Sequence, residues 1–188
     1  MKNIVLSIFA VGLAACQSVS NDELDRRTAE SRAVTKEFME TLNGELQAAM
    51  KAGGPLNSIQ VCNKRAPEIA AGFSDKKGSS GARTSLKFRN PDNAPDVCER
   101  TVLEQFEERK PNGEDPEQMG YAEVVEDAGM KKFRYMKAIP TGPVCLACPG
   151  ENIDAAVEAR IQELYPEDQA RGFNAGDIRG AFTITQPM

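Results

Sequence analysis

Two closely spaced cysteines, Cys145 and Cys148, are the residues of this sequence best suited to chemistry. A Cys-x-x-Cys pair commonly serves as a redox disulfide, as half of a zinc site, or as the thioether attachment point of a c-type haem. Two more cysteines, Cys62 and Cys98, can supply the remaining ligands of a four-coordinate zinc site. The pair can also form a purely structural disulfide. The pattern alone leaves these uses open.

Histidine is absent from the whole sequence. This absence excludes a histidine general base, a Ser-His-Asp triad and a His-ligated metal. The formal net charge of −5 argues against nucleic-acid binding, because phosphates require clusters of Lys and Arg. Since no other enzymatic constellation is present, the sequence predicts a protein that is not an enzyme.

The first 15 residues have the features of a bacterial lipoprotein signal peptide. Lys2 precedes an apolar run over residues 4–13, which is too short to span a bilayer. Residues 13–16 (LAAC) resemble a lipobox, so we expect cleavage before Cys16 and acylation of its thiol. No Asp follows the cysteine, which favours an outer-membrane lipoprotein facing the periplasm of a Gram-negative bacterium. The membrane, contacted through this anchor, is the predicted partner.

Export places the remaining four cysteines in an oxidising compartment, where disulfides can form. We expect residues 16–28 to be a lipidated tether and residues 29–188 to fold as a single domain, a length that fits one hydrophobic core.

The N-terminal half of this domain is predicted to be helical. An apolar stripe at four-residue spacing predicts one long helix, ended by Gly53-Gly54-Pro55; it consists of Val34, Phe38, Leu42, Leu46 and Met50. A second helix begins near Asn57. There Ile59, Cys62, Ala66 and Ile69 share a face, so Cys62 points inward, and Pro67 kinks or shortens the helix.

The remainder alternates between strands and helices. Strands are predicted over residues 84–88, 121–126, 131–139 and 178–184, and helices over residues 96–108 and 152–164. Residues 127–129 (DAG) indicate a hairpin turn. Together these elements predict an α+β domain with a mainly antiparallel sheet flanked by helices and a long N-terminal helix.

Several separated segments resemble the Tll0287-like domain family. They are residues 83–91 (RTSLKFRNP), 93–96 (NAPD), 133–136 (FRYM), 145–148 (CLAC) and 176–181 (GDIRGA). The resemblance extends over roughly residues 30–187. It implies a PAS-like fold that holds a ligand, in proteins similar to c-type haem proteins of redox or ligand sensing or of electron transfer.

In such proteins a Cys-x-x-Cys-His motif attaches the haem and ligates its iron. The resemblance therefore assigns Cys145 and Cys148 to thioether attachment and Cys62 to the opposite axial thiolate. Pro149 stands where the haem-ligating His would be, and a proline side chain has no donor atom. Cys98 is a second departure from the family pattern.

These two departures suggest an alternative, a haem-free, disulfide-stabilised binding or interaction module. Four thiols can pair in three ways, of which Cys62–Cys98 with Cys145–Cys148 is the most economical. The first bond would close a loop of roughly 35 residues and stabilise the fold by about 3–4 kcal/mol. A thiol-disulfide oxidoreductase that uses Cys145 and Cys148 is a third hypothesis.

Other side chains are secondary candidates for contacts with a haem. Met119, Met130 and Met136 are potential iron ligands, although methionine more often fills a core. The cations Arg83, Lys87 and Arg89 can pair with haem propionates or another acidic ligand.

Overall fold

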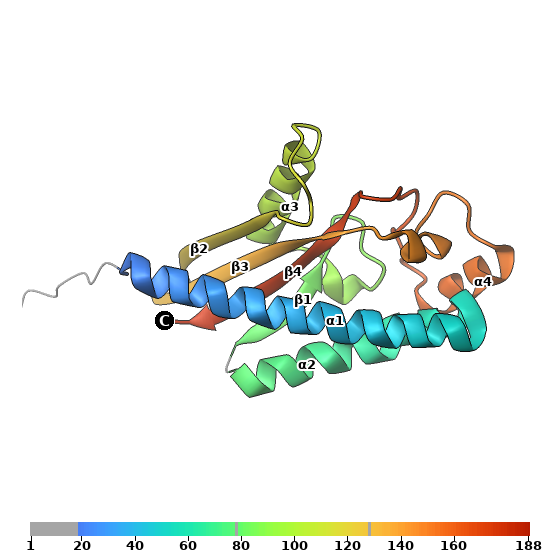
Figure 1. Cartoon of the computed structure of the whole chain (residues 1–188), viewed down its shortest axis with the longest axis horizontal. Helices are drawn as coiled ribbons and strands as arrows, with labels where there is room; N and C mark the ends of the chain where they lie inside the picture. Colours follow the sequence, from blue (N-terminus) through green and yellow to red (C-terminus); the bar gives the residue numbers. More distant parts are fainter. Residues whose placement is uncertain (1–18, 78, 128) are drawn as a thin grey trace, which may run out of the picture.

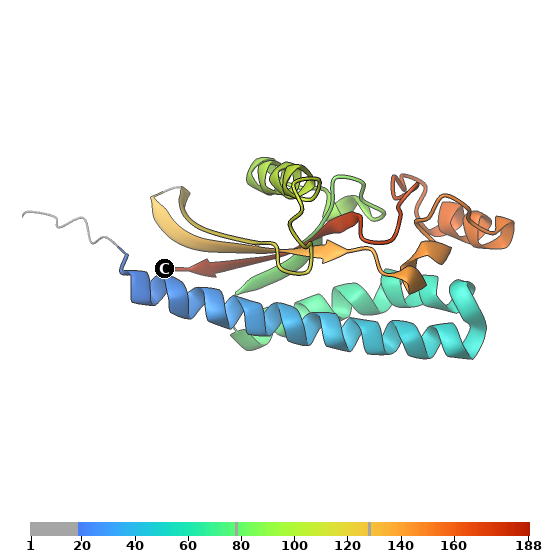
Figure 2. The same cartoon turned by 45° about the horizontal axis from the view of Figure 1, so that its top comes forward.

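A four-stranded antiparallel sheet forms the centre of the computed structural model, which describes residues 19–77, 79–127 and 129–188. The strands lie in the order β1-β4-β3-β2; their bounds are Ser80–Thr84 (β1), Gly120–Asp127 (β2), Met130–Pro140 (β3) and Ile178–Pro187 (β4). Helices α1 (Asn21–Gln60) and α2 (Ala66–Lys77) cover one face, and α3 (Val97–Arg109) covers the other (Figures 1 and 2). The expected α+β fold with a long N-terminal helix is confirmed.

Helix α1 begins at a side-chain cap and changes direction at a glycine pair. The Ser20 hydroxyl accepts a hydrogen bond from the backbone N–H of Glu23. Gly53 and Gly54 have non-helical backbone angles, with φ of 67° at Gly54. The chain turns back at this point and runs alongside its own first section (Figure 2). The predicted end of the long helix is therefore confirmed.

A π-helical turn, η1 (Val61–Arg65), joins the returning section of α1 to α2. Pro67, in the first turn of α2, has no N–H to donate to the carbonyl four residues earlier, which favours a local departure from α-helical bonding. Short π-helical segments often occur at functional sites. This one carries Cys62.

Each face of the sheet buries its own set of apolar side chains. Side chains alternate between the faces along a strand, so β3 and β4 contribute to both sets. Against α1 and α2, the buried set includes Val34, Phe38, Leu42, Ala66, Ile69, Phe133, Tyr135, Phe182 and Ile184. Against α3, it includes Val102, Leu103, Phe106, Met119, Met136, Ala138 and Ala181.

The segment after β3 forms a third packed region at one end of the sheet. It contains the 3-10 helix η3 (Pro143–Ala147) and helix α4 (Ala155–Leu164). Val157, Ile161 and Tyr165 pack against Ile59 from the returning section of α1. This cluster brings the η1 turn next to the segment that carries Cys145 and Cys148.

The strand predicted over residues 84–88 is wrong, since β1 ends at Thr84. Beyond this residue the chain leaves β4 and loops through the 3-10 helix η2 (Pro91–Asn93), with the Ser85 N–H donating to the carbonyl of Asn93. Leu86 then packs against the α3 cluster, whereas Phe88 lines a pocket near α1. The apolar alternation reflects these two separate environments, not one strand face.

The predicted signal peptide and Cys16 lie outside the described residues, as do residues 17 and 18. Within the part of the chain that the structure describes, none of the helices has the length and apolar character needed to cross a membrane.

Candidate functional site

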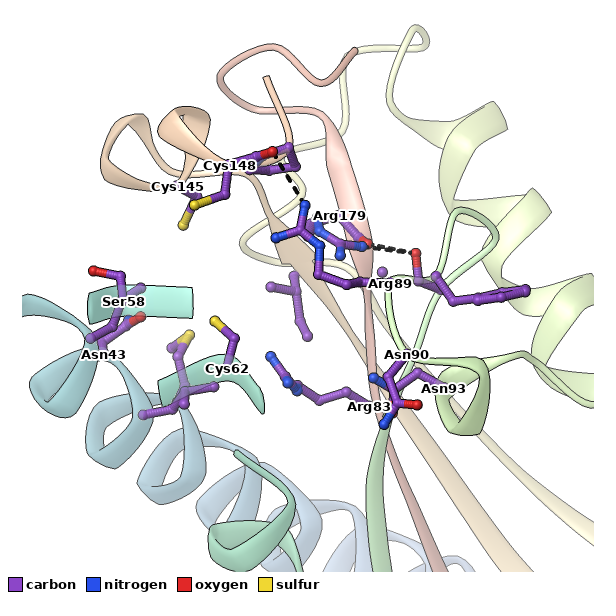
Figure 3. Close-up of a pocket in the computed structure, with 18 of the residues that line it drawn as sticks. Asn43, Ser58, Cys62, Arg83, Arg89, Asn90, Asn93, Cys145, Cys148 and Arg179 are labelled. Carbon is purple, nitrogen blue, oxygen red and sulfur yellow. Dashed lines mark hydrogen bonds between the residues drawn. The ribbon is translucent and has the colours of Figure 1, made fainter. Parts of the chain in front are cut away.

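A pocket lies where the two sections of α1, η1, η3 and the ends of β1 and β4 meet (Figure 3). Its wall on the α1 side is mostly apolar, with Leu42, Leu46, Met50 and Ile59 among the lining residues; Asn43 and Ser58 are its polar members. The apolar stripe predicted on α1 therefore has two roles. Its first residues pack on the sheet, whereas its last two, Leu46 and Met50, line the pocket.

Three of the four described cysteines line this pocket. Cys62 projects from η1, and Cys145 and Cys148 project from η3 and the residue after it, with all three sulfur atoms directed into a common space (Figure 3). All three side chains are half-buried. Residues that are more than 80 positions apart in the sequence thus meet here, with Cys62 opposite the other two.

Burial determines the acidity of the paired cysteines. Desolvation raises the pKa of the Cys145 thiol and of the Cys148 thiol, outweighing the opposing effect of nearby arginines. Both side chains are therefore neutral thiols at pH 7. Thiol-disulfide oxidoreductases instead lower the pKa of their attacking cysteine, so this environment does not favour the oxidoreductase hypothesis.

Neither expected disulfide is present, because all four described cysteines are free. The Cys62–Cys98 pairing is wrong for a reason of topology. Cys98 is exposed near the start of α3, on one side of the sheet, whereas η1 and Cys62 lie on the other (Figure 2). The same separation removes Cys98 from a zinc site. No group of three or more His, Cys, Asp or Glu placed to hold a metal occurs among residues 19–77, 79–127 and 129–188.

Pro149 follows the cysteine pair and also lines the pocket. Its backbone carbonyl accepts a hydrogen bond from Phe173 N–H at 3.0 Å, which ties this loop to the segment before β4. The proline ring contributes only carbon atoms to the pocket wall. None of the three methionines predicted as iron ligands lines this pocket. Met119 and Met136 are buried under α3, and Met130 is exposed in the β2–β3 hairpin.

Cationic side chains form the wall opposite the apolar one. Arg83 and Arg89, two of the three predicted cations, line the pocket. Lys87 does not. It is exposed outside the pocket, with its Nζ 5.3 Å from the centre of the Phe173 ring. The assignment of Lys87 to this site is therefore wrong, because the chain after Thr84 is a loop that directs successive side chains differently.

Arg179, at the start of β4, is the pocket cation that sequence reasoning missed. Its guanidinium donates to the Ser85 hydroxyl at 3.1 Å and to the Lys87 carbonyl at 3.2 Å, and lies 5.1 Å from the centre of the Phe173 ring. A lone charged residue in an otherwise apolar strand was the available signal. Desolvation, reinforced by Arg89 and Arg83, lowers the pKa of Arg179 to about 10, so it remains charged at neutral pH.

Comparison with known proteins gives a consistent result. The family model described as Tll0287-like matches residues 17–187. The crystal structure of the cyanobacterial heme-protein Tll0287 is similar to this chain, with a TM-score of 0.67 and 22% sequence identity. The alignment covers 90% of this chain and 98% of that one, so the two share a fold. Among curated proteins no match is found.

Proposed function

Because this chain belongs to the Tll0287-like family, we propose that it is a haem-binding domain of redox or ligand sensing or of electron transfer. The proposal draws on the heme-protein Tll0287, whose fold the chain shares. The observation that carries it is the convergence of three thiols in one pocket, with Cys62 facing Cys145 and Cys148.

The donor set of this pocket fits a haem in three respects. Cys145 and Cys148 have the spacing that forms thioethers with the vinyl groups of c-type haem. Cys62 would supply a thiolate ligand to the iron, a ligand type that other haem proteins use. The apolar wall of Leu46 and Met50 suits a flat hydrophobic ring. When bound, haem supplies a redox-active iron that can also bind small ligands.

One departure defines what kind of haem site this would be. Pro149 has no ligating atom and the sequence contains no histidine, so Cys62 is the one iron ligand that we assign. The raised pKa of Cys145 and of Cys148 makes these two neutral thiols less suited to metal ligation, which requires thiolate.

The domain is proposed to act at the outer membrane, facing the periplasm. The support is sequence alone: the apolar run over residues 4–13 and the lipobox that ends at Cys16. Acyl chains on Cys16 would anchor the protein, since each buried methylene contributes about 0.8 kcal/mol.

The test is an absorption spectrum of the full-length chain purified from a host that performs cytochrome c maturation. We expect a Soret band that survives acid-acetone extraction, which marks covalent haem. Cys62→Ala should shift the band by removing the thiolate ligand. Replacing both Cys145 and Cys148 by Ser should make the haem extractable, and Cys98→Ser, on the other side of the sheet, should change nothing.

Two results would count against this function. A protein that carries no haem under these conditions would favour a haem-free binding module. A Soret band with the same position and extractability in the Cys62 and Cys145/Cys148 variants would place any haem elsewhere.

A further inference from the structure

The pocket wall carries an excess of positive charge. Arg83, Arg89 and Arg179 all line it, and no Asp or Glu is among its lining residues. Among the described residues, the side chains of Arg83 and Arg179 form no ion pair with a carboxylate, and the Arg83 side chain also makes no hydrogen bond. Proteins normally pair cations that are withdrawn from water. This wall lacks its counter-charge.

Two of these guanidinium groups are held in place mainly by neutral partners. Arg179 donates to a hydroxyl and to a carbonyl. Arg89 donates to the carbonyls of Cys148 and Ala170, at 3.2 and 3.4 Å, and to the carboxylate of Asp168 at 3.2 Å. Asp168 is shared with Arg171, so it does not fully neutralise Arg89. Neutral acceptors orient a guanidinium while leaving its charge available.

Arg83 completes the cluster from the neighbouring strand. It lies on β1 opposite Phe182 of β4, and its side chain extends into the same space as the cysteine sulfurs (Figure 3). It is near enough to Arg179 for their charges to repel, as the lowered pKa of Arg179 reflects. Three like charges around one cavity favour an anion between them.

We infer that Arg83, Arg89 and Arg179 form an anion-binding subsite, which holds the carboxylates of an apolar, dianionic ligand by charge and hydrogen bonds alone. This inference deepens the proposed function, because a haem would place its two propionates here. From the proposed function it takes only the location of the binding pocket and the chemical class of the ligand. Neither iron nor a thioether is needed for the subsite to act.

The test uses mesoporphyrin IX, which has the two propionates of haem but neither iron nor vinyl groups. It cannot be ligated by Cys62 or attached to Cys145 and Cys148, so its binding reports the subsite separately from the proposed haem chemistry. We expect the full-length, haem-free chain to bind it in a fluorescence titration. Its dimethyl ester, which has no negative charge, should bind at least about tenfold more weakly, the factor that 1.4 kcal/mol represents.

Arg83→Gln and Arg179→Gln should each weaken mesoporphyrin IX binding by about tenfold or more and leave binding of the ester unchanged. Lys87→Gln is the matched control, because it removes a nearby cation outside the pocket, and it should have little effect. Arg83→Gln keeps the test decisive if Arg179→Gln does not fold, since it removes no side-chain hydrogen bond or ion pair of the described chain.

Stability gives an independent readout. Removing the Arg83 side chain relieves charge repulsion in the ligand-free pocket. Arg83→Gln should therefore raise the melting temperature of the ligand-free protein by roughly 2 °C, although it weakens mesoporphyrin IX binding. A structural arginine would instead lower the melting temperature. Equal affinity for the acid and the ester, or variants that bind mesoporphyrin IX as the parent does, would overturn the inference even if haem is bound through the cysteines.

Discussion

The four cysteines of the described chain occupy two distinct environments, and their reactivity should follow. Cys98 is exposed on α3, whereas Cys145 and Cys148 are half-buried thiols whose pKa is raised by desolvation. A raised pKa means a smaller thiolate fraction at pH 8, and the thiolate is the nucleophile. In the ligand-free protein, we predict that iodoacetamide modifies Cys98 at least about tenfold faster than either member of the pair, measured by peptide mass spectrometry.

A denatured sample is the control for this prediction. Once burial is removed, the four thiols should react at similar rates. Preferential labelling of Cys145 or Cys148 in the folded protein would contradict the assignment of neutral thiols and revive the oxidoreductase hypothesis.

Asp168 is the residue whose charge we expect to matter most for stability. Its side chain is 2% exposed, and one carboxylate oxygen accepts hydrogen bonds from the Arg89 Nε at 3.2 Å and the Ala170 N–H at 2.9 Å. Arg171 pairs with the other oxygen. Asp168→Asn leaves two arginines without a counter-charge, so we predict a loss of about 2–4 kcal/mol in the free energy of unfolding.

Urea denaturation measures this loss, with Glu163→Gln as the comparison. Glu163 also pairs with an arginine, Arg160, but its side chain is 66% exposed, so its loss should cost under about 0.5 kcal/mol. Similar effects of the two substitutions would show that burial does not set the contribution of the Asp168 pair.

At the level of elements, the glycines of α1 have opposite roles. Gly44 lies in the helix and a Cβ there would meet nothing within 4 Å, so Gly44→Ala should raise the free energy of unfolding by about 0.5–1 kcal/mol. Gly54 has a positive φ of 67° at the turn, where Ala is strained, so Gly54→Ala should lower it by about 1 kcal/mol. Thermal melts of the two variants measure these changes. A stability increase for Gly44→Ala and a decrease for Gly54→Ala would establish that Gly54 is required for the turn and not for a continuous helix.

The sequence predicts local elements well here and spatial partners less well. The apolar stripe of α1 and the pattern that predicted a helix over residues 96–108 are both local, and the structure contains both helices. The inward direction of Cys62 likewise follows from helical periodicity. By contrast, Cys98 and Cys62 were expected to pair. No local sequence pattern around either residue indicates that the sheet lies between them.

Strand β1 illustrates the same limit. Its end at Thr84 depends on β4, where Gly180 approaches so closely that an added Cβ would lie 2.3 Å from the Thr84 carbonyl oxygen. That contact joins residues almost 100 positions apart. Arg179, the adjacent residue, was missed for the same reason, because its value to the pocket depends on neighbours brought from β1 and from the loop that follows it.

At the scale of the whole molecule, the pocket and the proposed anchor lie at opposite ends of α1. Asn21 begins the helix beside the C-terminal end of β4, whereas Leu46 lines the pocket (Figure 1). At about 1.5 Å per residue, these two residues are separated by roughly 40 Å. Cys16 precedes Asn21 by five residues, which reach at most about 18 Å. Ligand binding should therefore be independent of anchoring.

Cys16→Ser tests this separation. Without the acylated thiol, the protein should leave the membrane fraction, either as soluble or as unprocessed chain, because residues 4–13 are too short to span a bilayer. Its affinity for mesoporphyrin IX should stay within about twofold of the parent, because the arginine cluster is remote from the anchor. Cys98→Ser should remain with membranes. A processed Cys16→Ser protein that still fractionates with membranes would refute the lipobox assignment, and a large loss of affinity would mean that the anchor end and the pocket are coupled through α1.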